Sequence, residues 1–289
     1  MSLVEKLTSL LGAWSPFRES MPAAFWSSTG WPDELVWALK SMFAHPMYEA
    51  VLDGRAPYER EKNPELWDAL RSEQERVWNF IKQCSIENIN FRGRPTAQGS
   101  YGKVFCNDKL CVKAVNYSQG VSGLALVSEA FIQQIVHNIY PPATPSTQVC
   151  KLDNDTLGVA MPRLKMDLYK YMSLGKPHPL DALAQIAFAL EMVRTHSQVG
   201  LVAHRDLHGG NIMCARIPGG ERMQMQIGNY ALDFETEWQW QIIDWGMACM
   251  SVAGLNLVTN EDHFFNNPGT KCKSAIDLTV LLHTYLRFP

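Results

Sequence analysis

A chain of 289 residues can form one large two-lobed domain or two modest ones, and its 46% hydrophobic content excludes wholesale disorder. The formal net charge of −3 argues against a general nucleic-acid-binding surface. The opening MSLVEKLTSLLGAW lacks the basic segment and sustained apolar run of a secretory signal, and no window is apolar enough for a membrane span. We therefore expect a soluble, cytoplasmic protein with no membrane or nucleic-acid partner.

The seven cysteines stand at irregular spacing and include no CxxC pair. An odd number without regular spacing is typical of intracellular proteins, in which thiols stay reduced. The sequence therefore predicts reduced thiols, and neither a disulfide framework nor a zinc site.

Residues 1–88 form a predicted helical extension that is rich in aromatic residues. One helix is predicted over 32–43 and a second over 63–84, the second with Asn63 as its cap and Pro64 as its first residue. Apolar residues of the first helix recur at helical spacing, at Leu35, Leu39 and Met42.

The aromatic residues of this extension have two interpretations. They could bind a partner protein, or they could pack the extension onto the next domain, since aromatic side chains bury large areas. The second interpretation also leads us to expect that the extension helps to position Glu129. The residues are Trp14, Phe17, Phe25, Trp26, Trp31 and Trp37.

From residue 89 onward the pattern changes to short alternating segments around turns, which is typical of antiparallel strands. A helix is predicted over 128–140, where apolar residues recur every four positions, and a strand hairpin over 147–164. A long amphipathic helix is predicted over 180–199. Strands first and helices later indicate an α+β fold in two lobes.

The segment QGSYGKV at 98–104 can form a turn that lets backbone N–H groups approach a polyphosphate. By itself the segment is more often an ordinary hairpin turn. Lys113 lies in the strand that follows, where an isolated lysine would extend into water.

Stronger signals come from VAHRDLHGGNIM at 202–213 and IIDWG at 242–246. Asp206 and Asn211, five residues apart, suit a base for a hydroxyl nucleophile beside an oxygen ligand for a hard cation. Asp244 places a carboxylate at the end of an apolar strand. Each segment also occurs as a plain loop, but the presence of all of them in one order, with plausible spacing, makes coincidence improbable.

Residues 89–288 resemble the protein-kinase superfamily in all of these segments. The resemblance implies a bilobal fold, with an N-lobe and hinge over 89–164 and a shortened C-lobe over 165–289. It also implies ATP and Mg²⁺ as cofactors. Lys113 would contact the α- and β-phosphates, and Glu129 would be its ion-pair partner.

The same resemblance assigns roles to the remaining candidates. Asp206 would be the catalytic base, Asn211 and Asp244 would bind Mg²⁺, and Asp277 would hold the backbone of the catalytic loop. Other ATP contacts would come from the glycine-rich loop (Gly99, Ser100, Tyr101, Gly102, Val104), the gatekeeper and hinge (Met161, Arg163, Leu164) and a ribose contact (Asp167).

Several features depart from the family pattern. His208 replaces the usual lysine or alanine and could contact the γ-phosphate, and FFNNPGTKC at 264–272 replaces an APE motif. The chain stops about a dozen residues after Asp277, which predicts a shortened C-lobe. About thirty residues separate Asn211 from Asp244, so a lengthened hairpin is predicted there.

The resemblance favours a serine/threonine protein kinase that acts on protein substrates and is similar to kinases of large DNA viruses of eukaryotes, located in host cytoplasm or virion. A small-molecule phosphotransferase of the aminoglycoside- or choline-kinase type and a non-catalytic scaffold remain alternatives. Candidate phosphorylation sites, or ordinary loop residues, are Ser251, Thr259 and Thr270.

Overall fold

A computed structural model of the chain describes residues 30–44, 61–84, 86, 89–99, 102–117, 122–175, 179–227, 229–259 and 275–286. Several predictions concern residues outside these ranges. They involve the loop residues Ser100 and Tyr101, the segment 264–272 with Thr270, and the aromatic residues Trp14, Phe17, Phe25 and Trp26.

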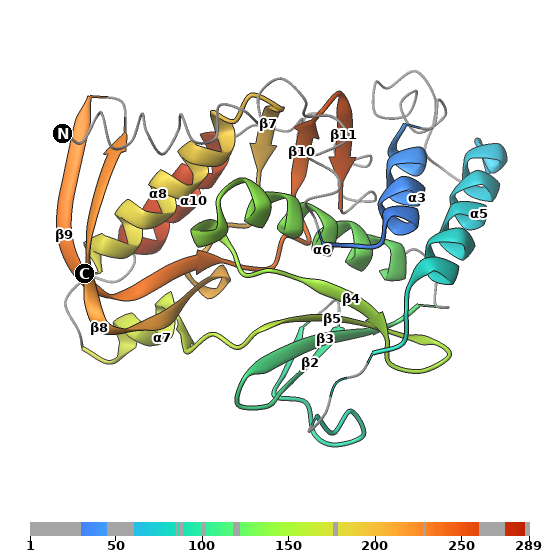
Figure 1. Ribbon diagram of the computed structural model, residues 1–289, viewed down its shortest axis with the longest axis horizontal. Coiled ribbons are helices and arrows are strands. Elements are labelled where there is room, and N and C mark those ends of the chain that lie inside the picture. Colours follow the sequence, from blue (N-terminus) through green and yellow to red (C-terminus); the bar gives the residue numbers. More distant parts are fainter. Residues whose placement is uncertain are drawn as a thin grey trace.

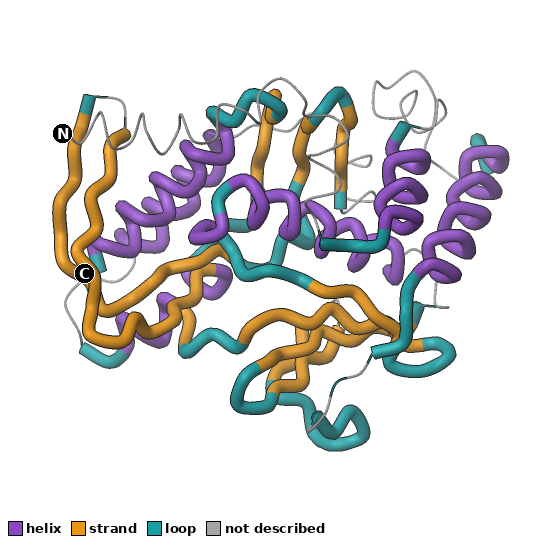
Figure 2. The backbone as a smooth tube through the Cα atoms, in the orientation of Figure 1, coloured by secondary structure: helices purple, strands orange, loops and turns teal. Residues whose placement is uncertain are grey.

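The described chain folds into helices and antiparallel sheets, so the fold class is α+β (Figures 1 and 2). The helices are α3 (Asp33–Phe43), α5 (Pro64–Phe80), α6 (Ser122–Ile139), α7 (Leu168–Ser173), α8 (Leu180–Arg194) and α10 (Ala275–Leu286), with 3₁₀ turns η2 (Pro141–Ala143) and η3 (Gly209–Asn211). The strands are β1 (Ala97–Gly99), β2 (Gly102–Cys106), β3 (Leu110–Asn116), β4 (Gln148–Lys151), β5 (Thr156–Pro162), β6 (Met166–Asp167), β7 (Val199–Ala203), β8 (Ile212–Ile227), β9 (Tyr230–Ile242), β10 (Cys249–Val252) and β11 (Leu255–Val258).

The strands that the sequence predicted after residue 89 form one antiparallel sheet in the order β1-β2-β3-β5-β4. Its register places Val104 and Val159 on either side of Lys113. Directly opposed residues of antiparallel strands point to the same face, so these three side chains share one face. The β4–β5 turn is the predicted one, because Asp153 accepts hydrogen bonds from the backbone N–H groups of Asp155 and Thr156.

Helix α6 lies between this sheet and a second sheet made of β7, β10 and β11 (Figure 1). The predicted core positions Phe131, Ile135 and Ile139 are all buried. The helix starts six residues before the predicted 128, and Gly123 in its first turn lies directly against the ring of Tyr117. A side chain larger than glycine would collide with that ring.

The N-terminal extension packs on the rest of the molecule. Trp31 is buried, its ring lies 5.5 Å from that of Phe131 on α6, and its indole N–H donates to the carbonyl of Thr147. Trp37, in contrast, is 57% exposed and carries the guanidinium of Arg76 4.4 Å from its ring. Both interpretations of the aromatic residues therefore stay relevant, each for a different tryptophan.

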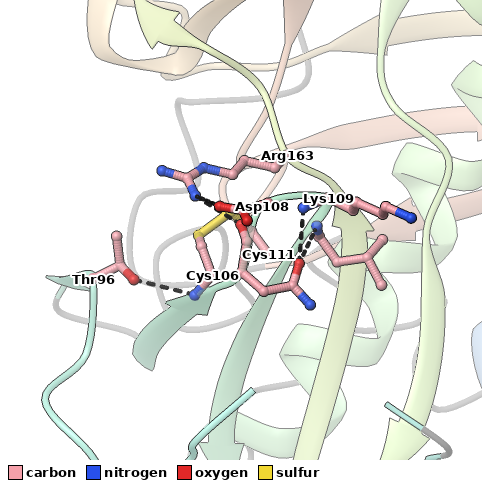
Figure 3. The surroundings of a disulfide bond; sticks show 8 residues. Thr96, Cys106, Asp108, Lys109, Cys111 and Arg163 are labelled. Carbon is pink, nitrogen blue, oxygen red and sulfur yellow. Dashed lines mark hydrogen bonds and ion pairs between the residues drawn. A yellow bond between two sulfur atoms is a disulfide. The ribbon is translucent and has the colours of Figure 1, made fainter. Parts of the chain in front are cut away.

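The prediction of reduced thiols is wrong for five cysteines. Cys84 is bonded to Cys150 and Cys106 to Cys111, and Cys249 is also in a disulfide. Figure 3 shows the second bond at the tip of the β2–β3 hairpin, where Thr96 accepts the N–H of Cys106. Disulfides persist in oxidising compartments, so the cytoplasmic location inferred from the cysteine pattern loses that support.

Two further predictions concern the C-terminal half. The lengthened hairpin between Asn211 and Asp244 is present as β8 and β9. The helix predicted over 180–199 ends at Arg194, because Val199 and its successors pair with β10 instead. Among the helices in the described ranges, none is long and apolar enough to cross a bilayer.

Candidate functional site

Three charged side chains from distant parts of the sequence meet on the inner face of the five-stranded sheet. Nζ of Lys113 on β3 donates to both carboxylate oxygens of Glu129 on α6 at 2.9 Å. It also donates to Oδ1 of Asp244 at 3.0 Å, across 131 positions of sequence. The side chains of Lys113 and Glu129 are 13% and 7% exposed, and that of Asp244 is 47% exposed. The ion pair that the resemblance implied is therefore present.

The electrostatics of this trio favour the charged forms of Lys113 and Asp244, but not that of Glu129. Burial would lower the pKa of Lys113, but the carboxylates of Glu129 and Asp244 raise it above its ordinary value. Burial raises the pKa of Glu129 to about 7, with Lys113 opposing the shift. Burial would also raise the pKa of Asp244, yet Lys113 holds it below its ordinary value. Lys113 thus stays an ammonium, and Asp244 stays ionised as a cation ligand must be.

Gly246 explains how two carboxylates fit beside one lysine. A Cβ at this position would lie 3.2 Å from Oδ1 of Asp244 and 3.2 Å from Oε2 of Glu129. These distances are tighter than ordinary contacts, so a larger side chain would require a carboxylate to shift by a few tenths of an ångström.

A second group forms in the loop before β8. The amide of Asn211 donates to the backbone carbonyl of Asp206 at 2.9 Å and to its carboxylate at 3.3 Å. Nδ1 of His208 accepts the N–H of Gly210 at 3.0 Å, which leaves the ring proton on Nε2, 3.7 Å from Oδ2 of Asp206. The ring of His208 also stacks on Tyr169. Asp206 and His208 are both about half exposed, so both side chains are accessible to solvent.

Asp277 on α10 fixes the backbone of this loop through two hydrogen bonds. Its carboxylate is 1% exposed and accepts the N–H groups of His204 and Arg205 at 2.8 and 2.7 Å. Arg205 adopts a left-handed φ of 68°, which such anchoring helps to maintain. The buried ring of His204 contacts the carbonyl of Ile243 at 2.9 Å, so the loop and the segment before Asp244 are tied together.

The predicted ATP-contact residues have different surroundings. Gly102 has a φ of 151°, and a Cβ there would lie 2.9 Å from the carbonyl oxygen of Ala114, so only glycine fits. Val104 and Met161 share the sheet face of Lys113 by register.

Hinge-region predictions are less uniform. The backbone N–H of Arg163 donates to the carbonyl of Lys109, and its guanidinium donates to the carbonyl of Asn107. Arg163 therefore stabilises the β2–β3 turn (Figure 3). Leu164 is buried, and Asp167 caps α7 by accepting the N–H of Lys170.

Two threonines frame the site in a role that the sequence did not predict, and Thr259 was predicted only as a candidate phosphorylation site. Thr144 and Thr259 are buried beside Trp245. Thr144 lies far from Trp245 in sequence, and Thr259 lies among ordinary loop residues. A lone threonine in a loop carries no signal of such a contact, because its partner is defined only by the tertiary fold.

The donor chemistry fits a magnesium–nucleotide complex. Within the described ranges no group of three or more His, Cys, Asp or Glu side chains is arranged to hold a metal by itself. A nucleotide-bound Mg²⁺ requires only one or two carboxylates or amides from the protein, since phosphate and water oxygens complete its shell. Asp244 and Asn211 are ligands of that type, and Lys113 is a suitable phosphate contact.

No protein-family model matches the chain, and no curated protein matches it significantly.

Proposed function

We propose that this chain is an ATP- and Mg²⁺-dependent protein kinase that transfers the γ-phosphate to serine or threonine hydroxyls of proteins, with a two-lobed kinase fold over residues 89–289. The observation that carries the proposal is the convergence of Glu129 and Asp244 on Lys113, at 2.9 and 3.0 Å. An ammonium between a helix carboxylate and a half-exposed carboxylate is an arrangement suited to a polyphosphate and its cation. The neighbouring Asp206 and Asn211 add a base and an oxygen ligand.

Each residue would have a defined task in the reaction. When bound, ATP supplies the phosphoryl group, and Mg²⁺ supplies positive charge that compensates the negative charge of the phosphates. Asp244 and Asn211 would hold the ion, and Lys113 would contact the phosphates. Asp206 would orient the substrate hydroxyl and take its proton, as the hydroxyl oxygen bonds to the γ-phosphorus and the bond to the bridging oxygen breaks, releasing ADP.

The test is transfer of labelled γ-phosphate from ATP to generic protein substrates or to the chain itself. We expect labelling that falls by about 10²-fold or more in Asp206→Asn and Lys113→Met. Lys103→Met is the matched control, because Lys103 is exposed on β2 next to Val104 and so points to the opposite sheet face.

Other outcomes would favour the alternatives. ADP release with an aminoglycoside or choline, without protein labelling, would indicate a small-molecule phosphotransferase. A raised melting temperature with Mg²⁺–ATP but no transfer to any acceptor would indicate a scaffold. If the protein neither binds Mg²⁺–ATP nor transfers phosphate, the proposal is refuted.

A further inference from the structure

Trp245, the residue after Asp244, is held by two threonine hydroxyls. Its indole N–H lies 3.3 Å from Oγ1 of Thr144, and its carbonyl oxygen lies 3.0 Å from Oγ1 of Thr259. Trp245 and Thr144 are fully buried, and Thr259 is 1% exposed. Hydroxyl and indole groups in such a core are costly to leave without partners. Thr144 therefore holds the indole, and Thr259 holds the backbone carbonyl of the same residue.

Thr144 also connects this tryptophan to the rest of the site. Its hydroxyl donates to the carbonyl of Ile242 at 2.6 Å, while its own carbonyl lies 2.9 Å from Nδ1 of His137 near the end of α6. Helix α6 carries Glu129, and the segment from Ile242 to Trp245 carries Asp244. One threonine thus links the two elements whose carboxylates meet at Lys113.

The backbone of Asp244 needs such support. Its φ is +59°, in the left-handed region that residues other than glycine seldom adopt. On its N-terminal side, the N–H of Ile243 donates to the carbonyl of Asn211 at 2.9 Å. On its C-terminal side, Trp245 is held by Thr144 and Thr259. Both neighbours of the strained residue are therefore fixed.

We propose that Thr144 is a positioning residue that keeps Asp244 directed at the cation site and so sets the Mg²⁺ dependence of nucleotide binding. Thr259 holds the other end of Trp245, and its buried hydroxyl has a structural task instead of serving as a phosphorylation site. This inference rests on the proposed function, since it assigns the ion to Asp244.

The experiment compares Thr144→Val, which removes the hydroxyl at nearly constant volume, with Thr144→Ser, which keeps it. The Mg²⁺ concentration that gives half-maximal thermal stabilisation by a non-hydrolysable ATP analogue is measured for each. Thr144→Val should raise it about tenfold and Thr144→Ser less than about twofold, because a buried hydroxyl that bridges two groups is worth on the order of one power of ten. In an Asp244→Asn background, Thr144→Val should add no further change.

Thr147→Val is the matched control. Thr147 is a buried threonine of the same loop, but its hydroxyl donates to the carbonyl of Ala130 on α6 and not to the Asp244 segment. It should lower stability without altering the Mg²⁺ dependence. An unchanged Mg²⁺ dependence in Thr144→Val would overturn the proposal. Should Thr144→Val fail to fold, Trp245→Phe removes the indole N–H together with part of the buried ring and should shift the dependence in the same direction.

A separate readout distinguishes this proposal from the failure of the proposed function. If the unaltered protein binds no Mg²⁺–nucleotide, amide hydrogen exchange at Ile243 and Ala248 still reports on the contact, since both N–H groups are hydrogen bonded in the segment around Trp245. Faster exchange there in Thr144→Val than in Thr144→Ser, with β5 unchanged, would support the positioning role. Equal exchange would refute it.

Discussion

Asp277 is the residue whose burial and hydrogen bonding most clearly serve the loop that carries Asp206. Its carboxylate accepts hydrogen bonds from two backbone N–H groups. Because Asp277 is only 1% exposed, water cannot take over as the acceptor of those bonds. In Asp277→Asn one of those N–H groups would face an amide NH₂, so we expect a loss of about 1–3 kcal/mol in the free energy of unfolding. Urea denaturation measures it. Asp153 also accepts two backbone N–H groups, but in an exposed turn, so Asp153→Asn should cost much less.

His208 separates two tasks within one ring. Nδ1 caps the η3 turn through Gly210, and Nε2 faces Asp206. An asparagine can place an acceptor near the position of Nδ1 but leaves nothing at Nε2. We therefore expect His208→Asn to keep the melting temperature while lowering kcat, whereas His208→Ala lowers both. Equal kcat in His208→Asn and the unaltered protein would show that Nε2 has no part in transfer.

At the scale of elements, the extension holds the helix that bears Glu129. Trp31 packs on Phe131, and Gln74 and Tyr117 exchange hydrogen bonds between α5 and the end of β3. We expect Trp31→Ala to cost about 3–5 kcal/mol, as removal of a buried aromatic side chain does. Trp37→Ala is the control, because Trp37 is mostly exposed. The free energy of unfolding and the amide hydrogen exchange along α6 are measured for both variants. Unchanged protection of the α6 amides from exchange in Trp31→Ala would contradict the role of the extension.

Local sequence patterns identified elements better than their ends. The periodicity of Leu35, Leu39 and Met42 was enough to predict α3, because all three side chains are buried. The end of α8 was missed, since residues after Arg194 turn into β7, and pairing with β10 overrides their helical pattern. The start of α6 was missed because its first turn packs through Gly123, a residue that lowers helix propensity.

The candidate site was predicted only where a motif lies within a few residues. Asp206, Asn211 and Asp244 stood out because their chemistry is local to short segments. The supporting contacts of Thr144 join positions 98 and 101 residues apart, and no local pattern encodes them. Their roles follow from the fold alone.

Across the whole molecule, a disulfide joins the N-terminal extension to the five-stranded sheet, which the sequence analysis described as separate parts. Cys84 and Cys150 connect the end of the extension to β4 across 66 residues, whereas Cys106 and Cys111 are only five apart. Loop-closure entropy predicts a loss of about 4 kcal/mol for Cys84→Ser with Cys150→Ser, and about 2 kcal/mol for Cys106→Ser with Cys111→Ser. Thermal unfolding with and without a reductant measures both. An equal effect of reductant on all variants would exclude these two bonds as contributors.

In the proposed site, Lys113, Asp206, Asn211 and Asp244 surround one Mg²⁺–nucleotide. A crystal structure of the protein with a non-hydrolysable ATP analogue and Mg²⁺ tests it most directly. We predict the ion bound by Asn211 and Asp244, the phosphates contacted by Lys113, and Asp206 facing the terminal phosphate. A nucleotide bound elsewhere, or a site that stays without nucleotide at saturating concentration, would refute the proposed site.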